Sequence, residues 1–156
     1  GAGWRAGQGR KAMKLFTLGF TKKSAEEFFG RLKRSGASRL VDVRLNNVSQ
    51  LAGFTKKDDL RFFTQAICGI PYLHLPLLAP TQAMLDGYKK AKGGWEGYER
   101  QFLALMADRK VEREVSRQDL DGTCLLCSED RPEHCHRRLV AEYLKEHWGD
   151  VEIIHL

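Results

Sequence analysis

The residues best suited to chemistry lie in two short stretches near the carboxyl end of the chain. Residues 127–129 read Cys-Ser-Glu, and residues 135–137 read Cys-His-Arg. Between them they supply two thiols, a carboxylate, an imidazole and a guanidinium, the groups that proteins use as nucleophiles, acids, bases, metal ligands and anion binders. Their types and spacing predict a functional site, and three kinds of chemistry are compatible with it.

Metal binding is one of the three, because thiolates and imidazole are ligands that suit zinc and iron. The four ligands would be Cys127, Cys135, His136 and either Glu129 or His134. Cys124 and Cys127 also have the C-x-x-C spacing. Residues three apart in a strand face opposite sides, however, so we do not expect these two to chelate one ion. The sequence therefore indicates Cys127, Cys135 and His136 as candidate ligands of a divalent metal cofactor.

Nucleophilic catalysis by a cysteine is the second possibility. Cys127 or Cys135 would be activated by a helix N-terminus, by Arg137 or by a neighbouring imidazole. Cysteine phosphatases and the related low-molecular-weight reductases place arginine six positions after the nucleophile, whereas Glu133 has that place after Cys127. A thioredoxin-type C-x-x-C opens a helix, whereas residues 124–127 end an apolar run. The sequence therefore argues against both of these thiol-enzyme classes.

Phosphate or nucleotide chemistry would use most of the candidates. The residues concerned are Asp42, Arg44, His74, Cys127, Glu129, His136 and Arg137. The two arginines would bind an anion, a carboxylate would act as general base or metal ligand, and a histidine would move a proton. Our leading hypothesis is therefore an enzyme, such as a hydrolase, that acts on a phosphorylated, nucleotide or nucleic-acid substrate. A non-catalytic metal- or small-ligand-binding module and a thiol-dependent enzyme remain alternatives.

The candidates outside the two stretches also have structural interpretations. Asp42 and Arg44 could form an ion pair that only stabilises the fold. His74 alternates with apolar residues, as a hydrogen-bonded core histidine would. Cys68 and Cys124 are expected to pack as small buried hydrophobes. The proposed site therefore depends on whether these residues meet in space.

The strands and helices that must position the candidate residues alternate along the chain. Short apolar runs alternate with amphipathic stretches from Met13 onward, which is typical of a mostly parallel sheet. The expected strands are Leu15–Gly19, Arg39–Val43, Tyr72–Leu75, Thr123–Cys127 and Val151–His155. Ligands bind beyond the carboxyl ends of such strands, and the candidate residues follow three of them. We expect a single three-layer αβα domain over residues 13–156, with about five strands and all candidates at one sheet edge.

Helix boundaries are predicted from capping residues and apolar spacing. We expect one helix from Ser24 to Gly36, one that begins at Trp95, and one from Asp130 to Trp148. A further helix, capped by Thr55 and Asp58, is expected to bury Leu60, Phe63 and Ile67 and to end near Gly69. His136 falls on the sheet-facing side of the last helix, so its side chain should point inward. Residues 80–94 interrupt the alternation of strands and helices, and we expect an irregular segment there that could act as a lid. Its Lys89–Lys92 run would be solvated or would contact a partner.

Composition bounds the class of protein. The chain has 156 residues, of which 42% are hydrophobic and 29% charged, and a net charge of +6. Residues 1–12 are Gly-rich, and we expect them to be a remnant of vector sequence or a disordered tail. Without their three basic residues the net charge falls to +3, which is weak support for a nucleic-acid partner. The absence of a long apolar run and the three clustered cysteines predict a cytoplasmic protein without a membrane partner.

Taken together, these motifs resemble the uncharacterised family called domain of unknown function 488. The resemblance spans Met13 to Leu156 and rests on Thr17-Leu-Gly with Thr21, Leu40-Val-Asp-Val-Arg44, Gly69-Ile70, Tyr72-Leu-His-Leu-Pro76, Leu125-Leu-Cys-Ser-Glu129 and Cys135-His-Arg137. It implies that the family's characteristic positions are Asp42, Arg44, Ser49, His74, Cys127, Glu129, Cys135, His136 and Arg137, and it implies no activity. The chain departs from the family pattern at Asn47, where proline is usual, and at Ala79, where glycine is usual.

Overall fold

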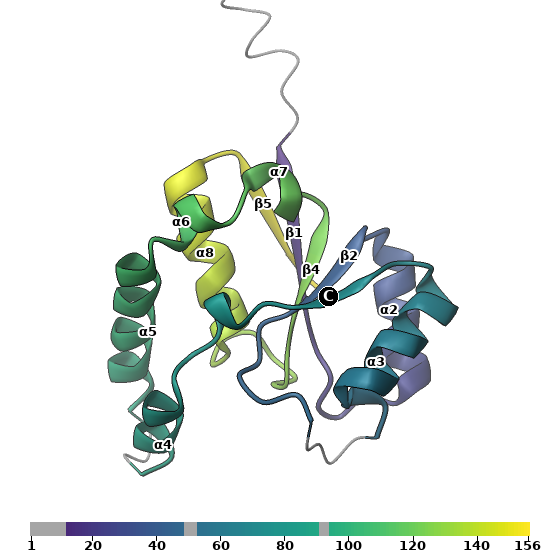
Figure 1. Cartoon of the computed structure of the whole chain (residues 1–156), viewed down its shortest axis with the longest axis horizontal. Coiled ribbons are helices and arrows are strands. Elements are labelled where there is room, and N and C mark those ends of the chain that lie inside the picture. The colour runs from purple at the N-terminus through teal and green to yellow at the C-terminus, as the bar shows by residue number, and fades with distance from the viewer. Residues whose placement is uncertain (1–11, 49–52, 91–93) are drawn as a thin grey trace, which may run out of the picture.

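Five parallel strands in the order β3-β2-β4-β1-β5 form the sheet of the computed structural model (Figure 1). The structure describes residues 12–48, 53–90 and 94–156. The strands are β1 (Met13–Gly19), β2 (Arg39–Asp42), β3 (Tyr72–His74), β4 (Thr123–Cys127) and β5 (Val151–His155). They confirm the five strands expected from the sequence, and the sheet is entirely parallel. The amino-terminal tail, Ser49 and Lys92 were named in the sequence predictions. Apart from Ala12, the tail lies outside the described residues, as do Ser49 and Lys92.

Helices cover both faces of the sheet, which confirms the three-layer αβα arrangement. Figure 1 shows α2 (Ala25–Ser35) and α3 (Lys57–Phe63) on one side of the strands, and α5 (Trp95–Arg109) and α8 (His136–Trp148) on the other. Each face has its own apolar core. Because side chains alternate along β4, Cys124 belongs to the core beneath α2 and Cys127 to the core beneath α5 and α8. The two thiols therefore lie on opposite faces, as their spacing predicted.

The remaining elements of the described ranges are short. They are the 3₁₀ turns η1 (Gly53–Thr55) and η3 (Pro76–Leu78), the π-helical turn η2 (Thr64–Cys68), and the helices α4 (Gln82–Lys90), α6 (Val111–Glu114) and α7 (Arg117–Leu120). None of the helices in the described part of the chain combines the length and the apolar run needed to cross a membrane.

Capping residues predicted one helix well and another poorly. The Ser24 hydroxyl accepts a hydrogen bond from the Glu27 amide at the start of α2, and Gly36 ends that helix at a φ of 74°, as expected. The prediction that Thr55 caps α3 was wrong, because Lys56 has that position and no side chain caps the helix. The expected single helix also changes to a π-helical turn, which adds a residue per turn. Ile67 is therefore rotated outward and is 42% exposed rather than buried.

The segment expected to be irregular contains a helix. α4 spans Gln82–Lys90, and the Thr81 hydroxyl accepts a hydrogen bond from the Met84 amide at its start. Leu85 and Tyr88, which are three residues apart, lie on the side of α4 that lines a cavity. The prediction failed because three lysines and two glycines near the end of the segment obscured this short apolar stripe.

The start of α8 also differs from its prediction. Asp130 and Glu133 were expected to open the helix, but α8 begins at His136, with Cys135 as the N-cap residue. The Asp130 carboxylate instead accepts a hydrogen bond from Lys23, at 2.7 Å. Residues 128–134 therefore form a loop between β4 and α8, which leaves Cys135 free of helical geometry and next to Cys127.

Candidate functional site

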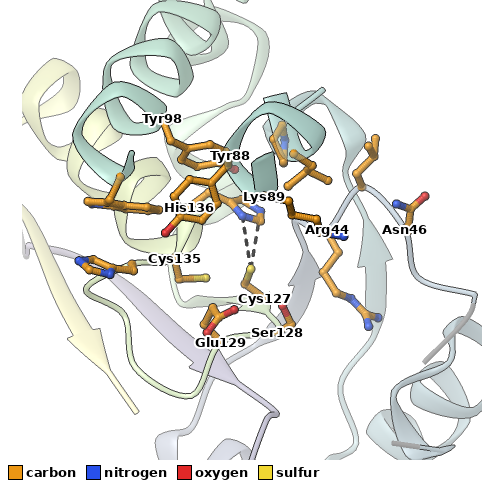
Figure 2. Close-up of a pocket in the computed structure, with 15 residues that line it drawn as sticks. Arg44, Asn46, Tyr88, Lys89, Tyr98, Cys127, Ser128, Glu129, Cys135 and His136 are labelled. Atoms are coloured by element: carbon orange, nitrogen blue, oxygen red, sulfur yellow. Dashed lines mark hydrogen bonds between the residues drawn. The ribbon is translucent and has the colours of Figure 1, made fainter. Parts of the chain in front are cut away.

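A cavity of about 430 Å³ opens at the carboxyl edge of the sheet. Its lining includes Arg44–Asn46 after β2, Leu85, Tyr88 and Lys89 from α4, Trp95 and Tyr98 from α5, and Cys127–Glu129 with His134–His136 from the β4–α8 connection. Figure 2 shows that these side chains converge from elements far apart in sequence. The structure therefore brings the two chemical stretches, apart from Arg137, together at one cavity.

Cys127 and His136 form a thiol–imidazole pair in this cavity. The Cys127 Sγ lies 3.4 Å from the Nδ1 atom and 3.8 Å from the Nε2 atom of His136, and that Nε2 atom lies 2.6 Å from the carbonyl oxygen of Val43. Because a carbonyl oxygen can only accept, Nε2 carries the proton and Nδ1 has a free lone pair. Both side chains are buried, as the inward direction predicted for His136 requires. The imidazole is thus held in the tautomer whose unprotonated nitrogen is the one nearer to the Cys127 sulfur.

The second thiol, Cys135, makes Cys127 the more acidic of the two. Burial of Cys127 raises the pKa of its thiol, but a hydrogen bond with Cys135, the charge of Arg137 and the next two backbone amides lower it by more. The pKa of Cys127 therefore lies below its ordinary value. The pKa of Cys135 lies well above it, because burial and the neighbouring Cys127 sulfur both disfavour its thiolate. Opposite shifts in one pair favour opposite roles, with Cys127 as the thiol that ionises more readily and Cys135 as the thiol that keeps its proton.

The same atoms could also hold a soft metal ion. The ligand atoms of Cys127, Cys135 and His136 all lie within 4.8 Å of one another. Two thiolates and an imidazole are a ligand set that suits zinc, and the Val43 carbonyl supports the ring from behind, as backbone carbonyls do in metal sites. His134, one of the two candidates for a fourth ligand, instead stacks on Trp95 with ring centroids 5.0 Å apart. Glu129, the other candidate, lines the cavity but lies outside this compact group, so the fourth position would face the cavity.

Asp42 and Arg44 form a buried ion pair beside the cavity. Arg44 Nε and Nη2 donate to the two carboxylate oxygens of Asp42 at 2.9 and 2.7 Å, and the Tyr72 hydroxyl donates to Oδ2 at 2.5 Å. His74 Nε2 donates to the Arg44 carbonyl oxygen at 2.7 Å. Arg44 touches the cavity wall, but Asp42 and His74 do not line it. The geometry therefore matches the structural interpretation of Asp42, Arg44 and His74.

Arg137 is also buried, with 1% of its surface exposed. Its Nη1 donates to the Glu129 carbonyl oxygen at 2.5 Å, and its Nη2 donates to the Asp130 carbonyl oxygen at 3.2 Å. The side chain does not line the cavity. The structure thus places Arg137 beneath the β4–α8 loop, where it fixes the backbone that follows Cys127.

The loop is held from a second direction by the residues that follow β1. The Thr21 amide and hydroxyl both donate to the Ser128 carbonyl oxygen, at 3.0 and 2.6 Å. Lys23 pairs with Asp130, and only 2% of the Lys23 side chain is exposed. Backbone amides 128 and 129, which stabilise the Cys127 thiolate, therefore have a fixed position.

Sequence reasoning did not identify the aromatic wall of the cavity. Trp95 and Tyr98 stack with centroids 5.2 Å apart, and Tyr88 lies 5.0 Å from Tyr98. The spacing of Trp95 and Tyr98 was a detectable signal, but it indicates a buried helix face as readily as a binding wall. At the two departures from the family pattern, Asn47 donates to the Tyr72 hydroxyl at 3.1 Å, and Ala79 is buried in extended conformation.

A comparison with known proteins gives one family. A protein-family model described as "Domain of unknown function DUF488" matches residues 24–144. No curated protein and no solved structure matches the chain. The matched range contains β2, β3, β4 and most of α8, and it therefore includes all the sequence-predicted site residues.

Proposed function

Because the chain belongs to the DUF488 family, whose description assigns no activity, we propose a function from the site itself: the protein is a thiol-dependent enzyme. Cys127 is the nucleophile and His136 is its general base. The observation that carries this proposal is the 3.4 Å approach of Cys127 Sγ to His136 Nδ1, with Nε2 held by the Val43 carbonyl. A nucleophile, a base and a group that orients the base are the three parts that thiol catalysis needs.

The geometry supports a simple sequence of steps. The Cys127 proton moves to His136 Nδ1, and the Cys135 thiol and the following backbone amides stabilise the thiolate. The sulfur then attacks an electrophilic atom of a small substrate in the cavity, and His136 returns the proton to the group that leaves. The aromatic wall formed by Tyr88, Trp95 and Tyr98 would hold the apolar part of that substrate and limit the access of water.

The pH dependence of alkylation tests this role. Cys127 should react with iodoacetamide at pH values where Cys68 is inert, because its pKa lies below its ordinary value while burial raises that of Cys68. His136→Asn should slow alkylation of Cys127 about 10²-fold near pH 7. The rate should recover at a pH high enough to ionise the thiol directly. Peptide mass spectrometry after timed alkylation measures each cysteine separately.

Other ionisable groups lie near Cys127 and affect the pH dependence of its alkylation. The charge of Arg137 favours the Cys127 thiolate, whereas the Tyr98 hydroxyl stays neutral, because burial and the nearby thiols raise its pKa. Cys124→Ser is the matched control, because this thiol lies on the opposite face of the sheet and its loss should leave the profile unchanged. A Cys127 that reacts no faster than Cys68 at any pH would contradict the proposal.

The anion-binding hypothesis draws less support from the structure. The Arg44 charge is neutralised by Asp42, and both Nη atoms of Arg137 donate to backbone carbonyls. Among the described residues, only Nη1 of Arg44 remains as a buried guanidinium NH₂ group without a hydrogen-bond partner. A phosphorylated substrate would therefore have to be bound mainly by Lys89 and backbone amides at the cavity.

Metal binding is a second candidate function, favoured by the compact group of Cys127, Cys135 and His136. Titration of the untagged, reduced protein with Co²⁺ should produce thiolate-to-metal charge-transfer absorption. Cys135→Ser should abolish that absorption, because two protein ligands rarely hold a tetrahedral ion. Cys124→Ser should not change it. Absorption that persists in the Cys135 variant would exclude this set of ligands.

A further inference from the structure

We infer that Cys127 and Cys135 form a reversible intramolecular disulfide when a hydroperoxide enters the cavity. Cys127 is the thiol that the hydroperoxide oxidises, and Cys135 is the thiol that resolves the product. This inference names a substrate class for the proposed thiol enzyme and rests on Cys127 being its nucleophile. It also gives a function to Cys135, which that proposal leaves as a hydrogen-bond partner.

Both sulfurs belong to the same cavity. Cys127 ends β4 and Cys135 is the N-cap residue of α8, and their Sγ atoms lie within 4.8 Å of each other and of His136. A disulfide needs the sulfurs about 2.05 Å apart, so one of the two must move toward the other. The structure therefore requires only a local shift.

The loop between the cysteines allows such a shift on the Cys135 side. Its first part is fixed, because Thr21 bonds to Ser128 and Lys23 to Asp130. Its second part lies at the surface, where the side chains of Arg131, Glu133 and His134 are exposed, and the backbone hydrogen bonds shown there are local, from Arg138 to Glu133 and from Cys135 to Pro132. Cys135 also precedes the regular part of α8. It can therefore approach Cys127 without disrupting the helix.

The reaction balances with the residues in place. The Cys127 sulfur attacks one oxygen of the hydroperoxide, an S–O bond forms, the O–O bond breaks, and the alcohol leaves with the proton from His136. Cys127 is then a sulfenic acid. Cys135 passes its proton to His136 and attacks the Cys127 sulfur, so that an S–S bond forms, the S–O bond breaks and water leaves. Two electrons pass from the two thiols to the hydroperoxide, and two external thiols restore the reduced site.

The other two cysteines cannot take the part of Cys135. Cys124 is fully buried on the opposite face of the sheet. Cys68 ends the π-helical turn η2 on that same face and donates to the Phe29 carbonyl oxygen. These two thiols provide matched controls within the chain.

The experiment uses the full-length reduced protein and hydrogen peroxide as the probe. After exposure to about one equivalent, free thiols are blocked with N-ethylmaleimide and the peptides are examined by mass spectrometry. We expect a cross-linked pair that contains Cys127 and Cys135, whose mass is lower by two hydrogen atoms and which dithiothreitol reverses. The Cys124→Ser variant should form the same cross-link. In Cys135→Ser, dimedone should instead trap the sulfenic acid at Cys127.

The outcomes separate the two proposals. Dimedone-labelled or over-oxidised Cys127 in the wild-type protein, with no cross-link, would overturn the role of Cys135 and leave Cys127 as the nucleophile. Cys127 that resists both peroxide and iodoacetamide would overturn both proposals. A cross-link that contains Cys68 or Cys124 in the folded wild-type protein would also overturn the inference. The cross-link and the oxidation of Cys127 are both measured in the wild-type protein, so these tests do not depend on whether Cys135→Ser folds.

Discussion

Gly19→Ala is expected to lower the free energy of unfolding by about 3 kcal/mol or more, because the end of β1 has no room for a methyl group. A Cβ atom at this position would overlap the backbone carbonyl oxygen of Glu129 and lie 2.8 Å from Arg137 Nη1. The first neighbour is backbone, which cannot move aside as a flexible side chain can. Either β1 or the β4–α8 loop would have to shift.

Urea denaturation followed by circular dichroism measures this loss. Gly87→Ala is the matched control, since Gly87 lies in α4 beside the same cavity and a Cβ there meets nothing within 4 Å. That change should stabilise the protein by about 0.5–1 kcal/mol, as glycine-to-alanine changes in helices do. Alkylation of Cys127 should also slow in Gly19→Ala, because the displaced loop carries the amides that stabilise the thiolate. Wild-type stability of Gly19→Ala would contradict the close approach of β1 to the loop.

Asp42→Ala is expected to cost about 3–5 kcal/mol, because it leaves a buried charge without its partner. The Asp42 side chain is fully buried, and Arg44 is only 5% exposed. The variant would lose three hydrogen bonds from Arg44, two from its guanidinium and one from its backbone amide, and one from Tyr72. The guanidinium would then remain buried with only the carbonyl of Thr55 as an acceptor among the contacts that the structure shows.

Glu27→Ala is the matched control for a surface ion pair. Glu27 pairs with Arg31 at 2.6 Å, but both side chains are about 40% exposed, so its loss should cost no more than about 0.5 kcal/mol. The two variants can be compared by the midpoint of urea unfolding. Equal small losses in both would show that the Asp42–Arg44 pair is not buried in solution. Because Val43 lies between these two residues, Asp42→Ala should also disturb the carbonyl that orients His136.

Local patterns were sufficient to predict the sheet and part of the helical layers. The apolar runs at residues 39–43 and 123–127 are long enough to be buried on both faces, and β2 and β4 are indeed inner strands of the sheet, as is β1. Ser24 and Gly36 fixed the ends of α2 because a cap is a local interaction. The π-helical turn after α3 and the start of α8 depend on contacts between distant segments, such as Asp130 with Lys23. No local pattern contains that information.

The site could be located from the sequence, but the roles within it could not. Residues that follow neighbouring parallel strands must share an edge, so the sequence predicted that Cys127, Cys135 and His136 lie close together, as they do in the structure. Sequence spacing does not say whether an arginine points into a cavity or into the protein, and the Arg137 side chain is engaged with backbone carbonyls. The aromatic wall comes from α4 and α5, whose packing against the sheet is decided by tertiary contacts. The part that the aromatic wall plays in the cavity can therefore be seen only in the structure.

The hydrogen bond from His136 to the Val43 carbonyl makes the two candidate functions competitors for a single electron pair. With Nε2 committed to that carbonyl, the imidazole has one lone pair to offer, on Nδ1. A proton from Cys127 and a metal ion would both require it. When a metal ion is bound at this site, His136 therefore cannot act as the base for Cys127. Metal binding would then protect Cys127 from reaction.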